Sequence, residues 1–409
     1  MTATRTIGSI ATFSKGSGLA KSDLVADGAH PCVHYGELFT RYGAIIDVVR
    51  SRTGRDLPVK SEVGDVLMPT SDVTPRGLAK ASALLSANVG LGGDVLIIRP
   101  DRAKADSRFL AYAIRHNVNQ VLKLVRGSTV YHLYAADMRH FELPSLPLAE
   151  QARVADALKD SDDLIDSLER LITKKQAIKQ GMMQELLTGR TRLPGFDGHW
   201  KETRLGDGGT CIRGVGYDPG SDLSSSDRPY AVRLLRSNNV QSSRVNYHDL
   251  QFVHERRVRS DQVLRTNDIV ICMANGSRAL VGKAALFAGV GGNLRYTIGA
   301  FMGVFRCNPT LIDASFAIEV MGAHSFRRWL DLILSGSSIN NLRPGDIESF
   351  VVPMPDLVEQ RAIADVLAEA NREIDLLRQR LAKARDVKQG MMQELLTGRT
   401  RLPVQETVA

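Results

Sequence analysis

Apolar residues recur every seven positions in two segments of the chain, over residues 158–172 and 367–381. A seven-residue period is typical of a helix that packs along a partner helix in a left-handed supercoil. The pattern predicts two helices that pack against each other in antiparallel orientation, each about 38 residues and about 57 Å long. We expect the coiled-coil contacts to come from Leu158, Ile165, Leu168, Ile172, Leu367, Ile374, Leu377 and Leu381.

The end of the first predicted helix is repeated in the second. Residues 179–194 and 388–403 both read KQGMMQELLTGRTRLP, at a constant shift of 209 positions. This period is far longer than that of a solenoid, so the chain contains two copies of a whole module. Because polar surface residues are also identical, we expect equivalent faces of the two helices to bind two copies of one partner. The residues expected to contact it are Lys179, Gln184, Glu185, Arg190, Lys388, Gln393, Glu394 and Arg399.

Both predicted helices carry boundary signals. The second opens with a D-x-x-E capping box that begins at Asp356, whereas the first has Pro147 at the same place in the repeat. Both end in Leu-Leu-Thr-Gly, whose glycine suits a left-handed C′ residue. Gly181 and Gly390 lie inside the helical pattern and predict a kink or break in each helix.

The segments that precede the two helices have the pattern of mixed α/β globules. Short apolar runs such as those at residues 7–10, 31–35, 63–67 and 94–98 are bounded by Gly, Pro, Asp or Ser, which is typical of strands and turns. The 3–4 spacing over residues 107–125 predicts one helix. Landmarks of the first globule recur in the second at shifts that grow from 198 to 209, so the second has gained about 11 residues.

The composition of the chain indicates what kind of partner it would bind and in which compartment it would be found. The chain has 409 residues, a formal net charge of +8 and a pI near 9.3, which suits an anionic partner such as nucleic acid. The four cysteines form no CxxC pair, which favours reduced thiols over disulfides or a zinc site. No run approaches the ~20 apolar residues of a membrane span, and the first residues lack the apolar run of a signal peptide. We therefore expect a soluble, cytoplasmic protein without a metal site.

The sequence contains no recognisable catalytic motif. A Walker-type phosphate loop is missing, and the glycine-rich segments 90–93 and 289–292 are better explained as turns than as a cofactor site. Asp356 and Asp386 superficially match a metal nuclease signature, but Asp386 lies on the heptad helix and its repeat equivalent is Ala177. These observations favour a binding protein without catalytic residues or cofactors.

Two other interpretations stay open. One is an enzyme, such as a fused methyltransferase or nuclease, which binding of S-adenosylmethionine by the purified chain would support. The other is a coiled-coil adaptor without a DNA role, which weak, salt-independent behaviour on DNA would support, because phosphate contacts give a steep salt dependence.

If the partner is DNA, Lys and Arg supply phosphate contacts, and Arg, Lys, Asn, Gln and Ser supply base contacts. For any single residue a solvated surface position is the simpler interpretation, but the polar, turn-rich stretches between strands form a coherent set. The DNA-binding candidates of the first globule are Lys15, Arg41, Tyr42, Thr70, Ser71, Arg76 and Lys80. Those of the second are Arg213, Arg236, Ser237, Asn238, Asn239, Asn275, Arg278, Arg295, Tyr296, Asn340 and Asn341.

Taken together, these features resemble the DNA-specificity subunit of type I restriction–modification enzymes. The resemblance rests on the duplicated helix with Glu150-Gln151 and Glu359-Gln360 near its starts, on the Leu-Leu-Thr-Gly-Arg endings, and on Gly-Ser segments at 127 and 336. It covers the whole chain, and the helix repeats are its specific part. Pro147 and the longer second globule depart modestly from the pattern.

The resemblance implies an α/β fold with a pseudo-twofold internal repeat. Two target recognition domains, 1–143 and 195–352, would be joined by two conserved helical spacers, 144–194 and 353–409, that form an antiparallel coiled coil. The subunit would itself be non-catalytic. Each domain would read one half of a split double-stranded DNA site, and the chain would recruit two methyltransferase subunits and, for cleavage, motor–nuclease subunits. The alternative is a DNA-recognition subunit of a methyltransferase-only system. A helix about 57 Å long would limit the half-site separation to roughly 17 base pairs.

Overall fold

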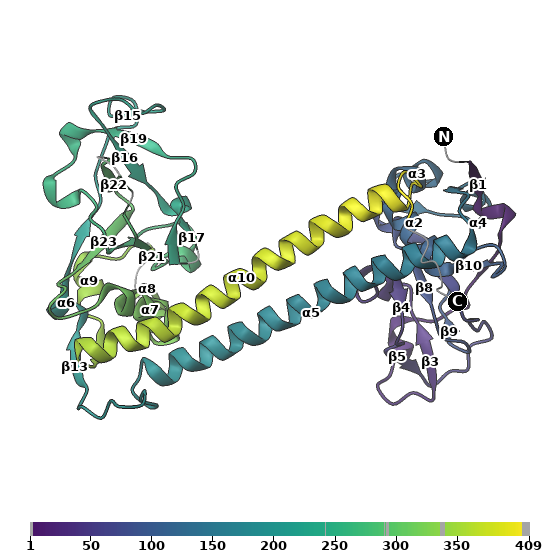
Figure 1. Cartoon of the computed structure of the whole chain (residues 1–409), viewed down its shortest axis with the longest axis horizontal. Coiled ribbons are helices and arrows are strands. Elements are labelled where there is room, and N and C mark those ends of the chain that lie inside the picture. The colour runs from purple at the N-terminus through teal and green to yellow at the C-terminus, as the bar shows by residue number, and fades with distance from the viewer. Residues whose placement is uncertain (1–2, 242, 290, 292–293, 336–339, 403–409) are drawn as a thin grey trace, which may run out of the picture. The chain divides into compact units, whose positions relative to one another are not determined.

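The computed structural model describes residues 3–241, 243–289, 291, 294–335 and 340–402. The chain divides into two compact units (Figure 1). Unit 1 comprises Met1–Arg170 and Arg378–Ala409, and unit 2 comprises Leu171–Leu377. Each unit therefore contains one globule together with part of both long helices.

The globule of unit 1 is built on a five-stranded sheet in the order β2-β10-β6-β8-β4 and a smaller sheet in the order β5-β3-β9. It also contains two short antiparallel pairs, β1-β12 and β7-β11. The strands are β1 (Thr4–Thr6), β2 (Ala11–Lys15), β3 (His30–Val33), β4 (Ile45–Ile46), β5 (Ser51–Thr53), β6 (Asp65–Pro69), β7 (Ser71–Asp72), β8 (Ser82–Leu84), β9 (Gly90–Leu91), β10 (Val95–Pro100), β11 (Tyr131–His132) and β12 (Glu142–Pro144). The helices are η1 (Ile7–Ser9), η2 (Lys21–Asp23), η3 (Pro75–Ala79), α1 (Glu37–Thr40), α2 (Ser107–His116), α3 (Val118–Leu124) and α4 (Ala135–Met138).

Two local predictions for this globule were wrong. Residues 7–9 form a 3-10 turn rather than a strand, with buried Ile7 donating its backbone N–H to Phe141. The single helix predicted over 107–125 is two helices, α2 and α3. They separate at Asn117, whose side-chain amide donates to the carbonyl of Ala113 and competes with continuation of the helix.

Unit 2 repeats this plan with one more strand in each of its two sheets. Its main sheet has the order β14-β23-β20-β21-β18-β17, its second sheet the order β15-β19-β16-β22, and β13 pairs with β24. The strands are β13 (Lys201–Arg204), β14 (Gly209–Arg213), β15 (Leu223–Ser224), β16 (Ala231–Leu235), β17 (Val240–Gln241), β18 (Ser243–Val245), β19 (Gln251–His254), β20 (Asp268–Cys272), β21 (Ala284–Phe287), β22 (Tyr296–Ile298), β23 (Met302–Cys307) and β24 (Val351–Met354). The helices are α6 (Leu205–Gly208), η4 (Ser237–Asn239), η5 (Glu255–Arg257), η6 (Ser260–Gln262), η7 (Arg278–Leu280), α7 (Ala314–Gly322), α8 (His324–Ser335) and α9 (Pro344–Glu348).

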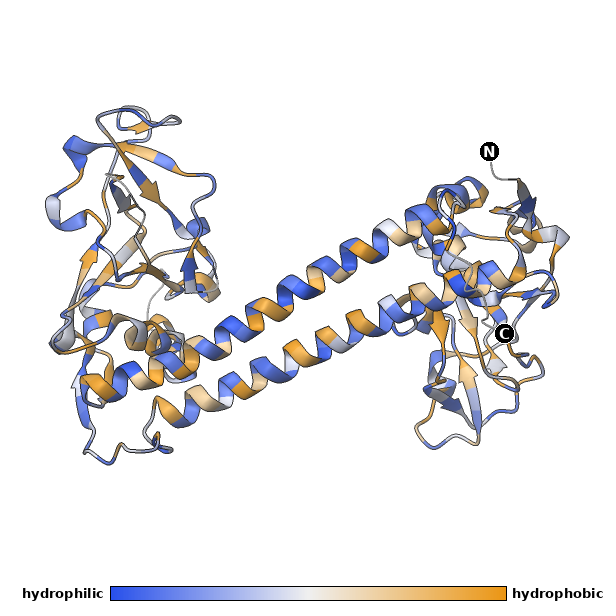
Figure 2. Ribbon diagram, in the orientation of Figure 1, coloured by the Kyte–Doolittle hydropathy of each residue, from blue (hydrophilic) through white to orange (hydrophobic). Residues whose placement is uncertain are grey.

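The two long helices, α5 (Leu148–Leu186) and α10 (Leu357–Leu395), have 39 residues each and begin at equivalent positions of the repeat. Apolar residues recur along both (Figure 2). The break predicted at Gly181 and Gly390 was wrong, because both helices run uninterrupted through these residues. The predicted glycine ends are confirmed: Gly189 and Gly398 have φ values of +70° and +69°.

The helices run antiparallel within each unit. In unit 1, Ser161 contacts Met391, and Glu169 accepts a hydrogen bond from Arg385. Residue numbers on α10 therefore decrease as those on α5 increase, which is the order of an antiparallel pair. In unit 2, Lys175 lies 2.6 Å from the carboxylate of Glu373. The predicted seam residues are buried or half-buried, and two of them, Leu158 and Leu367, lie within the hydrophobic cores of the globules. The predicted fold class, with two globules and two long antiparallel helices, is confirmed.

A glutamine near the start of each long helix fixes that helix to its globule. The buried side chain of Gln151 accepts from the backbone N–H of Asp106 and donates to the carbonyls of Lys104 and Leu146. Gln360 makes the same three bonds in unit 2, to Asp313, Leu311 and Pro355. A buried amide with all three partners is strongly constrained, because leaving such a group unsatisfied costs roughly 1–3 kcal/mol.

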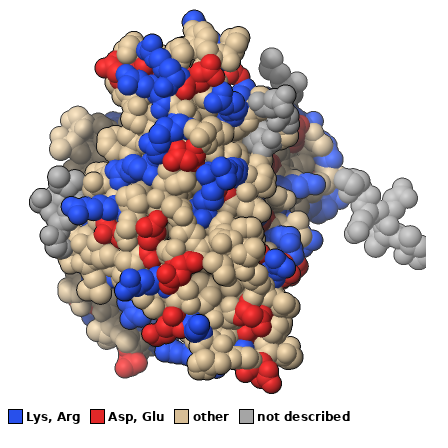
Figure 3. All heavy atoms as spheres, turned by 90° about the vertical axis from the view of Figure 1, so that its left-hand side faces the viewer, with Lys and Arg blue, Asp and Glu red and all other residues tan. Residues whose placement is uncertain are grey.

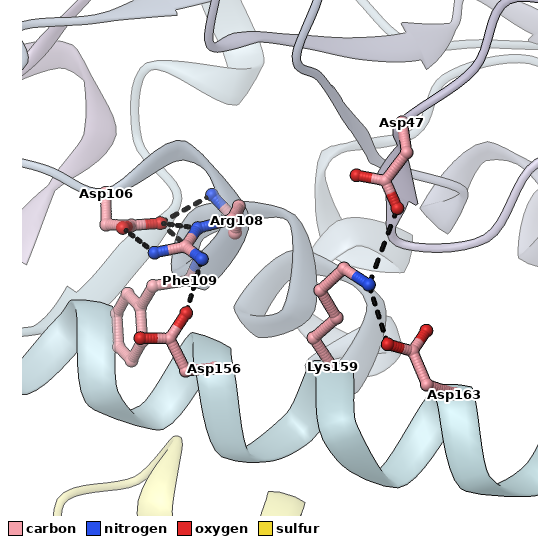
Figure 4. Close-up of polar contacts among 7 residues, drawn as sticks. All are labelled: Asp47, Asp106, Arg108, Phe109, Asp156, Lys159 and Asp163. Carbon is pink, nitrogen blue, oxygen red and sulfur yellow. Dashed lines mark hydrogen bonds and ion pairs between the residues drawn. The ribbon is translucent and has the colours of Figure 1, made fainter.

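Charged contacts on α5 complete the attachment in unit 1 (Figure 4). Asp106 caps α2 by accepting from the backbone N–H groups of Arg108 and Phe109, and the Arg108 guanidinium bridges Asp106 to Asp156 on α5. One turn further along α5, Lys159 lies between Asp47 of the globule and Asp163. The hydrogen bond to Asp106 is the largest cause of the raised pKa of Arg108.

Candidate nucleic-acid interface

In unit 1, one end of the main sheet gathers three polar side chains. Lys15 ends β2, Thr70 follows β6, and Asp94 lies in the four-residue turn that joins β9 to β10. The carbonyl of Gly92 closes this turn by accepting from the Val95 N–H at 3.2 Å, and the carbonyl of Asp94 accepts from the Thr70 N–H at 2.9 Å. The Lys15 ammonium lies 3.4 Å from the Asp94 carboxylate, with both side chains largely exposed.

The same construction occurs in unit 2. Arg213 ends β14, and the turn from Gly299 to Met302 joins β22 to β23, closed by a 2.8 Å hydrogen bond. The carbonyl of Phe301 accepts from the N–H groups of Met273 and Ala274, which follow β20. The equivalent position in unit 1 is Asp94, so the two units place a carboxylate and a benzyl group at one structural site.

Close backbone approach fixes this arrangement in both units. A Cβ on Gly16 would lie 2.0 Å from the carbonyl oxygen of Gly92, and one on Gly214 would lie 2.1 Å from that of Gly299. Only glycine fits at such separations, so these residues let the end of the first sheet strand pass beside the turn. The turn is thereby held as a rigid part of the sheet.

Arg213 uses its guanidinium to position this end of unit 2. Its Nε donates to the carbonyl of Ala300 at 2.9 Å, and its two terminal nitrogens donate to the carbonyl of Leu342 and the side-chain oxygen of Asn341. Asn340 and Asn275 lie alongside, since the Asn275 N–H donates to the carbonyl of Asn340. The structure therefore brings together four of the residues predicted to bind DNA, and Arg213 holds the side chain of one of them, Asn341. The neighbouring residues 336–339, part of the predicted Gly-Ser segment, lie outside the described residues.

The other candidates of unit 1 lie on two neighbouring features. Ser71 belongs to the β7-β11 pair and Thr70 directly precedes it, and Arg76 and Lys80 lie in or directly after η3. Arg41 and Tyr42 follow α1, where Arg41 donates to buried Glu37 and lines a cleft of about 580 Å³ that also contains Arg50 and Arg52. Burial raises the pKa of Tyr42, whose hydroxyl accepts from the Arg50 N–H, so it is a neutral phenol at physiological pH.

Two candidates of unit 2 are unavailable for DNA contact in this structure. Tyr296 is only 5% exposed and packs against Tyr247 and Phe287, because all three residues of β22 are buried. Asn239 is 1% exposed, and its amide holds the loop closed by donating to the carbonyls of Asn246 and His248. These two predictions were wrong because a polar or aromatic residue near a turn can equally serve the interior.

The remaining candidates of unit 2 lie at its surface in ion pairs or hydrogen bonds. Arg236 and Asn238 both contact the Asp249 carboxylate, and Ser237 begins η4 between them. Arg278 pairs with Asp331 and Arg295 with Glu255. On the face drawn in Figure 3, Lys and Arg side chains are interspersed with acidic ones and do not form an unbroken basic patch.

The repeated lysines predicted to bind a partner make intramolecular ion pairs. In unit 1, Lys388 contacts Asp162, which also accepts from the Tyr112 hydroxyl at 2.7 Å. In unit 2, Lys179 lies 3.1 Å from Glu319, which also accepts from Asn371. Tyr112 and Glu319 occupy equivalent positions of α2 and α7, as do Asp162 and Asn371 of the long helices. The lysine is the same in both units, but its acidic partner lies on the other long helix in unit 1 and on the short helix α7 of the globule in unit 2.

The other predicted partner-binding residues are exposed. Glu185 and Glu394 each accept a hydrogen bond from a threonine six positions later in the repeat. Gln184 and Arg190 line a groove of about 250 Å³ beside the start of α8. Their repeat equivalents, Gln393 and Arg399, are also exposed.

Sequence reasoning missed the positions that distinguish the two sheet ends. Asp94 and Phe301 were not candidates, because Asp94 was counted with an apolar run and Phe301 followed a glycine-rich segment without any motif. Aligning the two copies so that Gly92 falls on Gly299 places Asp94 on Phe301, which would have identified the two positions as equivalent. The segment 289–292 is only partly covered by the described residues.

The described residues contain no group of three or more metal-ligating side chains. Burial raises the pKa of Cys32 to about 11 and that of Cys211 to about 12, so these thiols are protonated and unreactive at neutral pH. Among the described helices, none combines the length and apolar character that crossing a membrane requires.

Part of the chain is similar in sequence to known proteins. Residues 64–180 match the family model of the type I restriction modification DNA specificity domain. The chain is 30% identical over 191 residues to the type I restriction enzyme EcoKI specificity subunit of Escherichia coli (strain K12), and 29% identical over 189 residues to the StySPI specificity subunit of Salmonella potsdam. Each alignment covers 46% of this chain, but only 40% and 39% of those relatives.

The fold is also found in a solved structure. The crystal structure of a type I restriction-modification system S subunit from M. genitalium superimposes with a TM-score of 0.64 at 14% identity, covering 96% of each chain. At this identity the likeness establishes the fold alone. The resemblance to type I specificity subunits that the sequence predicted is confirmed by these comparisons together.

Proposed function

From its relationship to the specificity subunits of type I restriction–modification enzymes, we propose that this chain is the DNA-reading subunit of such a complex. It reads a bipartite double-stranded site, one half with each globule, and contributes no catalytic residues itself. The observation that carries the proposal is the duplicated sheet end. A rigid, repeated backbone that presents different side chains in its two copies suits the recognition of two different half-sites.

Recruitment of partners is the second part of the proposal. The exposed positions that are identical in both copies, Gln184 with Gln393 and Arg190 with Arg399, bind two methyltransferase subunits in equivalent ways. Identity at these positions supports this role, because neither pair belongs to the buried core. In a complete restriction system, motor–nuclease subunits join the same assembly.

The decisive experiment is a single-molecule methylome of cells that express the chain with its methyltransferase, with and without the gene. The expected result is a split motif with an unread gap that disappears on deletion. Binding by the purified complex should also weaken steeply with salt, because each phosphate contact releases counterions. Salt-independent binding without a motif would refute DNA reading and favour an adaptor.

A further inference from the structure

Phe301 is the most exposed aromatic residue in the described part of the chain, with 68% of its surface accessible. Its backbone is nevertheless firmly held. The Phe301 carbonyl accepts two hydrogen bonds, the adjacent Ala300 carbonyl accepts from Arg213, and the Gly299 N–H donates to Leu235. A single exposed apolar side chain is common on a protein surface. What sets Phe301 apart is the firmly bonded turn that carries it and the polar residues beside it.

The surroundings of Phe301 are polar, which suits the reading of base edges better than the docking of an apolar partner. Asn275, Asn340 and Asn341 lie in the segments bonded to this turn or to Arg213. Amide side chains recognise base edges, whereas an exposed phenyl ring can make apolar contact with the C5-methyl group of thymine in the major groove. Arg213 donates to the side chain of Asn341. The Asn275 side chain accepts from the Ser277 N–H, and that of Asn340 donates to the carbonyl of Gly276.

The equivalent position of unit 1 supports the same interpretation. Asp94 lies in the corresponding turn, 48% exposed, and pairs with Lys15 at the position of Arg213. A carboxylate can accept from the N4 amino group of cytosine, while a phenyl ring can make no such bond. The site therefore changes its base chemistry between the two copies while its backbone stays the same.

We propose that Phe301 is a specificity-determining residue, which reads a thymine through its methyl group in the half-site bound by unit 2. This inference rests on the proposed DNA-reading function. The contact involves only the C5-methyl group of thymine and none of the hydrogen-bonding groups of the base pair.

Replacing thymines by uracil tests the proposal directly, because the exchange removes only the methyl group. The purified complex of the full chain with its methyltransferase is titrated with target duplexes in which each thymine of the two half-sites is replaced in turn. The expected result is one position where uracil weakens binding about fourfold, the value of one buried methylene-sized group. The Phe301→Ala complex should bind the thymine and uracil duplexes equally.

Two further variants separate the thymine contact from other roles. Leu311→Ala truncates an exposed side chain (51% accessible) that follows the opposite end of β23, and it should preserve the discrimination between thymine and uracil. Phe301→Leu keeps an apolar group and should retain part of that discrimination. Unchanged thermal unfolding of Phe301→Ala would show that the turn still folds.

The outcomes distinguish failure of this inference from failure of the proposed function. If the wild-type complex shows no sequence-specific binding, the DNA-reading function itself fails, and the inference with it. If binding is specific but uracil is accepted everywhere, or Phe301→Ala still prefers thymine, the inference alone is overturned. Equal loss on all sequences would assign Phe301 to a sequence-independent contact, which also overturns it.

Discussion

The ion pair between Lys179 and Glu319 predicts that this lysine stabilises unit 2, whereas its repeat equivalent, Lys388, does not. The Lys179 ammonium lies 3.1 Å from a carboxylate whose side chain is only 11% exposed. At this distance the attraction is about 1.3 kcal/mol in bulk water and about 5 kcal/mol at an effective dielectric constant of about 20. After desolvation and screening, we expect Lys179→Met to cost about 2 kcal/mol, mainly because it leaves the Glu319 carboxylate without a counter-charge.

Both tryptophans of the chain, Trp200 and Trp329, belong to unit 2, so tryptophan fluorescence reports the unfolding of that unit. With a urea m-value of about 2.5 kcal/mol/M, the expected loss lowers the fluorescence midpoint by about 0.8 M. Lys388→Met is the matched control, because it changes the same residue of the same repeat but breaks the pair with Asp162 in unit 1. It should leave the fluorescence transition in place.

A double substitution identifies the cause of the loss. Adding Glu319→Gln to Lys179→Met removes the unpaired charge while keeping an acceptor for Asn371, so most of the lost stability should return. Equal shifts for the two lysine variants would refute the assignment of each pair to its own unit. Failure of the double variant to recover would refute the unpaired carboxylate as the source of the effect.

Three other predictions concern the sheet end, the spacing and the pH response. Gly214→Ala should cost about 1–3 kcal/mol of unfolding free energy and weaken DNA binding, because its Cβ would overlap the Gly299 carbonyl. The control in urea melts and binding titrations is Gly216→Ala, whose added Cβ would meet nothing within 4 Å. A heptad inserted in register into both α5 and α10 should lengthen the unread gap of the methylated motif, and a methylome with the old gap would contradict helix-set spacing. The Asp218 N–H and the Arg256 and Arg257 guanidiniums lower the pKa of Asp222 to about 2. Because the folded-state pKa is depressed, the stabilisation exists above the unfolded value near 3.8 and is lost as pH falls toward 2. Asp222→Asn should therefore reduce stability at pH 7 and flatten its decline over that interval, as measured by urea midpoints against pH.

Much of the architecture could be predicted from the sequence because it depends on repetition and periodicity. The seven-residue spacing of Leu158, Ile165 and Ile172 specifies a helix with one apolar face wherever that helix docks. The identical glycines that end both helices take left-handed conformations because side chains disfavour them. Mixed α/β globules and the resemblance to type I specificity subunits followed from such local signals.

The tertiary structure alone decided what individual polar residues do. Lys179 and Lys388 are followed by identical residues in sequence, yet one meets a glutamate from α7 and the other an aspartate from α5. Tyr296 became a core residue, and Phe301, five positions later, became the exposed tip of a turn. The physical reason is that sequence periodicity fixes the face on which a residue lies, whereas its partner comes from segments distant in the chain that only folding brings together.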